Sequence, residues 1–201
     1  IPKVSSKIYP TTAAIRAKAV SIVIKKDMGE NIFASGAYSS SINEFAIANS
    51  LGVWAYNQTS SIDFSTILLG KTSTFIAYSR CNKPGEINPE EIANKAIAKV
   101  KLGEHPKRVK PGSWEVILEP QAVNEMMVFF AWWGPNARIY HEQASYFSGK
   151  LGKKVLGNNI TIFDDPLNIQ SFPMPFDFEG YPKKKLTIIE KGYFRNIVYD
   201  S

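Results

Sequence analysis

The sequence predicts an α+β fold, with an antiparallel meander sheet and flanking helices followed by the start of a second, mixed β-rich domain. Three observations predict it. Apolar residues recur with helical spacing near residues 11–27, 88–103 and 121–133. Residues 31–81 instead alternate polar and apolar side chains and are rich in β-forming residues. Residues 104–113 are polar and contain two prolines and a glycine, which indicates a linker.

This linker divides the chain into two expected domains. Residues 1–108 are predicted to be the latter part of an N-terminal α+β domain, in which a helix, the meander and a second helix follow one another. Residues 109–201 are predicted to be the first part of a C-terminal β-rich domain. The chain begins with isoleucine rather than methionine, so we expect it to be a portion of a longer protein.

In the first domain, the threonines at 11 and 12 can cap a helix over residues 11–27, and Gly29 can end it. The serine- and threonine-rich meander is expected to have one solvated face. Its predicted strands are residues 32–39, 44–50, 53–59, 62–69 and 74–80, separated by short breakers that include Ser40-Ser41 and Ser60-Ser61. Residues 49–52 predict a tight hairpin turn, because Gly52 can adopt a positive φ. Asn88 and Pro89 are suited to begin the second helix.

In the second domain, residues 114–118 are predicted to be a strand and residues 121–133 a helix. A shorter helix is expected within residues 138–148. The remaining expected features are glycine-punctuated turns in 149–157, a strand at 159–163, a proline-rich loop at 172–176, a turn at 177–180, a strand at 186–190, a turn at Lys191-Gly192 and a last strand at 193–198.

Composition excludes several classes of protein. Hydrophobic residues make up 44% and charged residues 21% of the 201 residues, which is ordinary for a globular chain and not for a disordered one. The single cysteine, Cys81, cannot form an internal disulfide. No secretory signal is visible, and apolar runs such as residues 126–133 are too short to span a membrane. We therefore expect a cytoplasmic protein without a membrane partner.

The net charge of +6 is spread along the chain. Residues 1–100 carry an excess of +4 and residues 101–201 an excess of +2, so neither half is a basic tail. The small basic runs at 107–110, 150–154 and 183–185 resemble solvated loops more than a phosphate-binding track. Nucleic acid is therefore not an expected partner.

No complete catalytic or metal-binding set is present. The two histidines, His105 and His141, lie too far apart in sequence to form a zinc-binding helix, and His141 is interpreted as a surface or structural residue. Neither a nucleophile elbow nor a phosphate-binding loop is found. Cys81 lies at the end of a predicted strand without a positioned base, so a nucleophilic role is not expected.

Two clusters have alternative interpretations. The carboxylates of Asp164, Asp165, Asp177 and Glu179 could form a cation site or an acid–base pair, but turn chemistry is favoured. The aromatic residues of 129–133 could face a ligand or a partner subunit, or they could belong to a buried helix.

Several strings, in order along the chain, resemble the TldD/PmbA family, whose members include proteins known as modulators of DNA gyrase and metalloproteases of peptide maturation. The strings are NSLGV at 49–53, GSWEVILEPQAV at 112–123, FSGKLGKKV at 147–155, TIFDDP at 161–166, FDFEGYP at 176–182 and IIEKG at 188–192. Family chains are considerably longer, so the resemblance implies an internal portion that lacks the opening part of the N-terminal domain and much of the C-terminal domain.

The resemblance implies a metallopeptidase fold. In the TldD branch, the helix after the first C-terminal strand carries His-Glu-x-x-x-His, whose histidines bind the metal and whose glutamate activates water. The matching positions here are Asn124, Glu125 and Phe129, so the glutamate is present and both histidines are absent. This departure resembles the PmbA (TldE) branch, the metal-free subunit that pairs with TldD. It implies that this chain has no catalytic, cofactor or metal residues, with zinc only in a TldD-like partner.

The expected partners are a TldD-like subunit, or further copies of this chain, and a peptide substrate. The expected function is that of the non-catalytic subunit of a heteromeric metalloprotease that processes small or unfolded peptides. Two alternatives remain open. One is a divergent metallopeptidase whose ligands lie outside these residues. The other is a DNA-gyrase-linked binding protein, which would bind DNA with a steep salt dependence.

Overall fold

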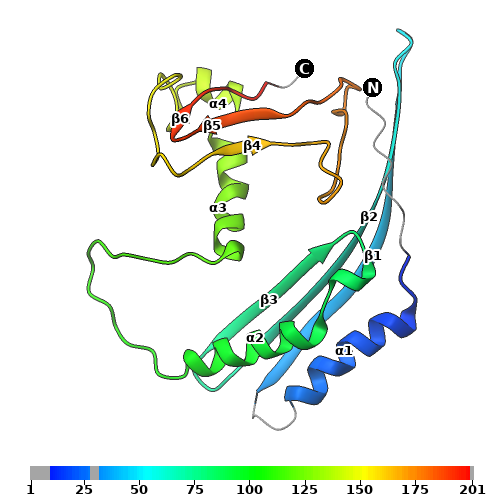
Figure 1. Ribbon diagram of the computed structural model, residues 1–201, viewed down its shortest axis with the longest axis vertical. Coiled ribbons are helices and arrows are strands. Elements are labelled where there is room, and N and C mark those ends of the chain that lie inside the picture. The colour runs from blue at the N-terminus through cyan, green and yellow to red at the C-terminus, as the bar shows by residue number, and fades with distance from the viewer. Residues whose placement is uncertain (1–9, 28–31, 200–201) are drawn as a thin grey trace.

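The computed structural model describes residues 10–27 and 32–199, and Figure 1 shows their arrangement. The expected helix stop at Gly29 lies outside the described residues. In chain order the elements are α1 (Ala13–Asp27), β1 (Phe33–Ala48), β2 (Trp54–Leu69), β3 (Thr74–Cys81), the 3-10 helix η1 (Pro84–Glu86), α2 (Pro89–Leu102), α3 (Pro120–Trp133), α4 (Ala137–His141), β4 (Ile162–Asp164), β5 (Leu186–Glu190) and β6 (Tyr193–Phe194). None of the described helices is both long and apolar enough to cross a lipid bilayer.

An antiparallel sheet in the order β1-β2-β3 confirms the predicted meander. The predicted strand at 74–80 is confirmed as β3, but the four shorter strands before it were wrong, because β1 and β2 are each continuous over 16 residues. The supposed breakers face each other across the ladder, where Ser41 pairs with Ser61 and their hydroxyl oxygens lie 2.7 Å apart. Serine can interrupt a strand by bonding the nearby backbone, but here the Ser41 and Ser61 hydroxyls bond each other across the two strands.

Helices α1 and α2 cover one face of this sheet, as Figure 1 shows. Asn88 caps α2 as predicted, since its side chain accepts a hydrogen bond from the Glu91 N–H. The buried core between helices and sheet contains Val23, Ile32, Ile62, Phe64, Leu68, Ala77, Ile87, Ala93, Ala96 and Val100. Alternate β2 residues from Ile62 to Leu68 face this core, as a period of two residues requires.

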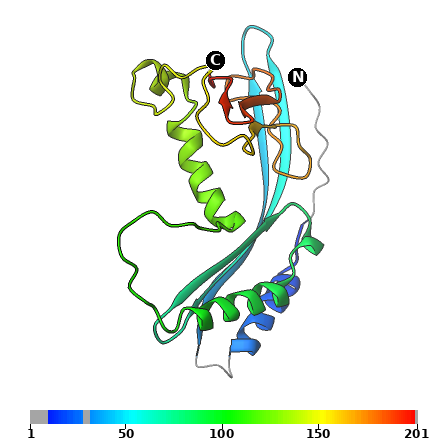
Figure 2. The ribbon, with the colours of Figure 1, turned by 60° about the vertical axis from the view of Figure 1, so that its left-hand side comes forward.

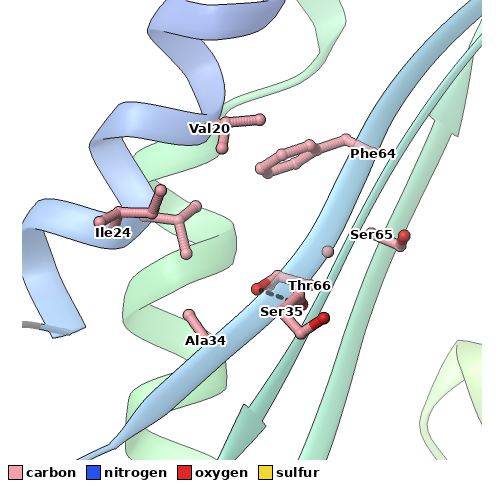
Figure 3. Close-up of a pocket in the computed structure, with 9 residues that line it drawn as sticks. Val20, Ile24, Ala34, Ser35, Phe64, Ser65 and Thr66 are labelled. Atoms are coloured by element: carbon pink, nitrogen blue, oxygen red, sulfur yellow. Dashed lines mark hydrogen bonds between the residues drawn. The ribbon is translucent and has the colours of Figure 1, made fainter.

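Packing beneath α1 leaves a cavity of about 280 Å³, shown in Figure 3. Val20 and Ile24 of α1 face Phe64 of β2 across it, while Ser35 and Thr66 lie on the sheet side. The Thr66 hydroxyl donates to the Ser35 carbonyl, so the polar groups at this wall bond within the sheet. The cavity is partly open to solvent, since Ile24 is 48% exposed.

The β1–β2 hairpin extends past the two helices as a two-stranded arm, visible at the top of Figure 2. Its tip is the predicted turn, in which Gly52 has a φ of 86° and Asn49 accepts from the N–H groups of Leu51 and Val53. The arm contacts the C-terminal region on one side. There the buried Asn57 amide donates to the Pro173 carbonyl at 2.9 Å.

The C-terminal region is built around a small antiparallel sheet in the order β4-β5-β6. Its core contains Phe147, Ile188, Ile189 and Phe194. The predicted turn at Lys191-Gly192 is confirmed, with φ angles of 47° and 83°. The fold class predicted from the sequence is confirmed as well, since helices flank one antiparallel sheet and a second sheet follows.

Three predicted elements of this region are shorter than expected. The strand at 159–163 is β4 at 162–164, because a turn closes between Gly157 and Ile160. The helix within 138–148 ends at His141, before Gln143 adopts a φ of 59°. The last strand stops at Phe194, after which the Arg195 and Asn196 N–H groups both bond the Ile188 carbonyl.

The predicted strand at residues 114–118 was wrong for the described part of the chain. These residues have no regular secondary structure and no strand partner there. The Ile117 side chain is 97% exposed, and those of Trp114, Val116 and Leu118 are also exposed. The composition is typical of a strand, but a strand forms only where another strand satisfies its backbone groups.

Candidate functional site

Helix α3 carries the three positions that match the metal-binding motif of the TldD branch. Its surroundings therefore define the candidate site. Its C-terminal end is fixed in the small core. Phe130 packs edge-on against Phe147, with 5.6 Å between ring centroids. After the helix, the Ser145 hydroxyl donates to the Gly134 carbonyl at 2.6 Å. Because Gly134 also lies against Phe130 and Phe147, the end of the helix is closely packed.

Ion pairs attach the N-terminal end of α3 to α2. Glu119, which precedes the helix, forms ion pairs with Lys99 and Lys95 of α2, and the Lys95 pair has an N–O distance of 3.2 Å. The hydrogen bond from Lys99, followed by that from Lys95, lowers the pKa of the Glu119 carboxyl. These two contacts span the linker and connect α2 to the start of α3.

Asn124, Glu125 and Phe129 are all exposed on α3. At about 100° per residue, they lie within one half of the helix circumference, together with Val128 and Trp132. Phe129 is 63% and Trp132 is 68% exposed. The helix therefore brings the three motif positions to one face, and that face is mainly apolar.

The opposite face of α3 borders an apolar groove of about 670 Å³. Val123, Met126, Met127 and Phe130 line it from the helix. The remaining lining residues are Leu118, Tyr146, Phe147, Leu156, Ile160, Thr161, Ile162 and Phe163. The groove thus runs between the helix and the strand β4, with the motif positions on the far side of the helix.

The residues present do not fit a zinc ion at the motif. Glu125 is the only one of the three that offers a ligand type preferred by zinc, since a carboxamide is not among these ligands and a phenyl ring has no lone pair. Within residues 10–27 and 32–199, no group of three or more histidine, cysteine, aspartate or glutamate side chains could hold a metal ion. No catalytic step through a metal can be derived from this part of the chain.

The other candidate residues lie apart from α3 or have structural partners. The His141 Nε2 atom lies 3.4 Å from the Tyr199 hydroxyl oxygen, and His105 is in the exposed linker. The Cys81 thiol donates to the Lys83 carbonyl. Burial raises the pKa of this thiol, which favours the unreactive protonated form.

The carboxylate cluster does not form a single site. Asp177 accepts from the N–H groups of Glu179 and Tyr181 at 2.9 and 2.8 Å, which is the predicted turn chemistry. Asp165 instead pairs with Lys185 at 3.1 Å. The geometry supports the turn interpretation for Asp165, Asp177 and Glu179, whereas Asp164 is the last residue of β4.

Sequence reasoning missed the groove, although one signal was available. Residues 126–133 are apolar around the whole helix, which is typical of a helix that is covered on more than one side. Which residues line the groove depends on how β4 packs beside α3, and the strand at 159–163 was predicted without a position in space.

Two family models match consecutive parts of the chain. The PmbA/TldA metallopeptidase central domain matches residues 9–103, and the PmbA/TldA metallopeptidase C-terminal domain matches residues 111–201. An uncharacterized protein of Methanocaldococcus jannaschii is 27% identical over 172 residues, which are 84% of this chain and 40% of that protein. A metalloprotease of the same organism is 28% identical over 110 residues, which are 54% of this chain and 24% of that protein.

Solved structures share the fold. A Thermotoga maritima protein described as a modulator of DNA gyrase superposes with a TM-score of 0.83 at 20% identity over 98% of this chain. TldE from Thermococcus kodakarensis superposes with a TM-score of 0.77 at 20% identity over 99%. This chain spans 48% of each of these solved chains, and 40% or less of the curated relatives. Since the two family models together match nearly all of its residues, the chain belongs to the TldD/PmbA family.

Proposed function

We propose that this chain is part of a TldE-like, non-catalytic subunit that pairs with a metal-bearing TldD-like subunit in a peptide-degrading or peptide-processing metalloprotease. One observation carries the proposal. The helix in the motif position has Asn124 and Phe129 where two histidines would be needed. The likeness in fold to TldE supports the same branch.

The exposed face of α3 that carries the motif positions is better suited to binding a partner subunit than to catalysis. Phe129 and Trp132 lie on it together, and large exposed aromatic side chains are enriched where proteins associate. Glu125 is the one ionisable residue of the helix. In this proposal the TldD-like subunit supplies the metal ion, the activated water and the residues that act on the peptide bond.

The first test is metal content. The full-length polypeptide, purified alone, is expected to contain less than stoichiometric zinc, and a co-expressed TldD-like subunit is expected to contain one zinc ion per chain. A stoichiometric zinc ion in this polypeptide alone contradicts the proposal and favours the divergent metallopeptidase. Substituting Glu125→Gln provides a control, since it should leave the zinc content and the peptidase activity of the complex unchanged.

The second test is association. The two purified subunits should elute together in size-exclusion chromatography, and peptide cleavage should require both of them. Replacing Phe129→Asp should weaken the complex, whereas Val109→Asp in the exposed linker should not. Separate elution, together with unchanged cleavage by the TldD-like subunit alone, refutes the pairing. DNA binding that falls steeply with salt would favour the gyrase-linked alternative instead.

A further inference from the structure

The linker at residues 104–113 is exposed along its whole length, and Figure 1 shows it in the loop that leads from α2 to α3. It contains neither helix nor strand. Within the described chain, no backbone N–H of residues 105–113 donates to another backbone group. An endopeptidase needs a substrate segment whose backbone is accessible and unpaired, and the linker meets this requirement without local unfolding.

The linker also offers cationic side chains at its centre. Lys107 and Arg108 are adjacent, and Lys110 follows them. The bond after Lys110 is a poor substrate, because Pro111 has no N–H and a fixed φ. The bonds after Lys107 and Arg108 therefore suit an endopeptidase whose specificity pocket takes a lysine or arginine side chain.

The basic runs after α4 and before β5 are less accessible to such an enzyme. In the first run, the Gly152 N–H donates to the Phe194 carbonyl at 2.7 Å. In the second, the Lys183 N–H donates to the Pro175 carbonyl at 2.8 Å. Because these backbone hydrogen bonds must open before a protease can bind the segment, cleavage there is expected to be slower than in the linker.

Cleavage in the linker divides neither of the two hydrophobic cores. The buried residues of the large core lie between Val23 and Val100, and those of the small core lie between Phe147 and Phe194. The two family models also leave residues 104–110 uncovered. Each half of the chain therefore keeps its own core after a cut at the centre of the linker.

Contacts outside the linker hold the two halves together. The buried Asn57 amide donates to the Pro173 carbonyl at 2.9 Å. The Asn82 amide donates to the Ile169 carbonyl, also at 2.9 Å. Glu119 adds its ion pairs with α2. Since none of these side chains belongs to the linker, a cut in the linker does not remove the contacts.

We propose that the bonds after Lys107 and Arg108 are a proteolytic cleavage site for an endopeptidase that recognises cationic side chains, and that the two fragments remain associated through the contacts of Asn57 and Asn82. Cleavage after Arg108 adds water across the peptide bond, which leaves a carboxylate on Arg108 and an amino group on Val109. The product is a two-piece particle in which α3 keeps its place relative to the central sheet. This inference does not depend on the proposed function.

Limited digestion of the full-length polypeptide with trypsin tests the site, and mass spectrometry of the denatured products locates each cut. Cuts in the linker should precede those in the basic runs after α4 and before β5. A Lys107→Gln/Arg108→Gln variant should slow linker cleavage at least about tenfold, because only the bond before Pro111 then follows a cation. A Lys153→Gln/Lys154→Gln variant is the control and should leave the rate unchanged. Earlier cleavage in either of the other runs overturns the proposal.

Size-exclusion chromatography of the cut protein over a dilution series tests the association. The cut wild type should elute with the uncut polypeptide, with both fragments in one peak. A cut Asn57→Ala/Asn82→Ala variant should dissociate at a protein concentration at least about tenfold higher than the cut wild type. Asn43→Ala, on exposed β1, is the control and should match the wild type. Separation of the cut wild type into fragments overturns the proposal, and equal dissociation of the double variant and the wild type refutes the assigned contacts.

Discussion

The central sheet and the α3 region both carry large apolar side chains, but these are buried in the first and largely exposed in the second. Phe64 of β2 is 1% exposed because α1 and α2 both pack over it. Phe129 of α3 has no comparable neighbour, and the helix is anchored mainly at its two ends. An apolar pattern on a helix therefore indicates that its side chains favour burial. Whether they are buried depends on which other elements pack against the helix.

The largest expected effect is at the covered phenylalanine. Replacing Phe64→Ala should lower the free energy of unfolding by about 3–5 kcal/mol, since it removes a buried ring and leaves a cavity. Phe33→Ala is the matched control on the neighbouring strand, where the ring is 78% exposed, and should change stability by less than about 0.5 kcal/mol. Urea unfolding measures both. Equal losses would contradict the description of the central sheet as the closed core.

The contact between the arm and the C-terminal region is tested by removing its buried hydrogen bond. Asn57→Ala removes the donor to the Pro173 carbonyl and should cost about 1–3 kcal/mol. It should also speed thermolysin cleavage before the exposed Ile169, because the loop loses its attachment to the sheet. Asn43→Ala, at an exposed position of β1, serves as the control. Unchanged cleavage in the Asn57 variant would show that this hydrogen bond does not hold the loop.

Alanine substitutions at two glycines with positive φ distinguish the cost of backbone strain from the cost of a steric clash. Gly149→Ala should cost about 1–2 kcal/mol, since φ is +69° and a Cβ there meets no atom within 4 Å. Gly180→Ala should cost about 1–3 kcal/mol more, because its Cβ would lie 2.6 Å from Val53 Cγ1 at the hairpin tip. Thermal unfolding of the two variants compares them. If they lose the same stability, the tip and the C-terminal region are not in close contact.

The smallest effect is expected where charge holds α3. Lys99 and Lys95 lower the pKa of Glu119, so the ion pairs stabilise the folded state at neutral pH, and this contribution is lost as the pH falls through that lowered pKa. The Tm difference between the wild type and Glu119→Gln should therefore be present at pH 7, shrink in acid, and decrease in 1 M salt. Glu125→Gln is the control. A Tm difference that persists below the lowered pKa would exclude the ion pairs as its cause.

Local chemistry made several elements predictable. The cap of α2 and the turns at 49–52, 177–180 and 191–192 each depend on residues within four positions of one another. Asn88 can cap, and Gly52 can adopt positive φ, whatever the remainder of the chain does. The three motif positions on α3 were located by resemblance, and helix geometry then placed them on one face.

The predictions from sequence failed where the structure depends on pairing between segments that are distant in the chain. Ser40-Ser41 and Ser60-Ser61 resemble breakers until the register sets Ser41 opposite Ser61. Residues 114–118 resemble a strand, yet no partner is present in the described chain. In both cases the local pattern gave the capacity to pair, and the presence or absence of a neighbouring strand decided the result.

By itself, the sequence determined the α+β class, the helix caps, the turns and the absence of histidines from residues 121–133, because these follow from residue type and short-range geometry. Only the tertiary structure decided that β1 and β2 are continuous, that the motif face and the groove lie on opposite sides of α3, and that the arm meets the C-terminal region through Asn57. The physical reason is that burial and strand pairing depend on segments distant in sequence, whose meeting no local pattern encodes.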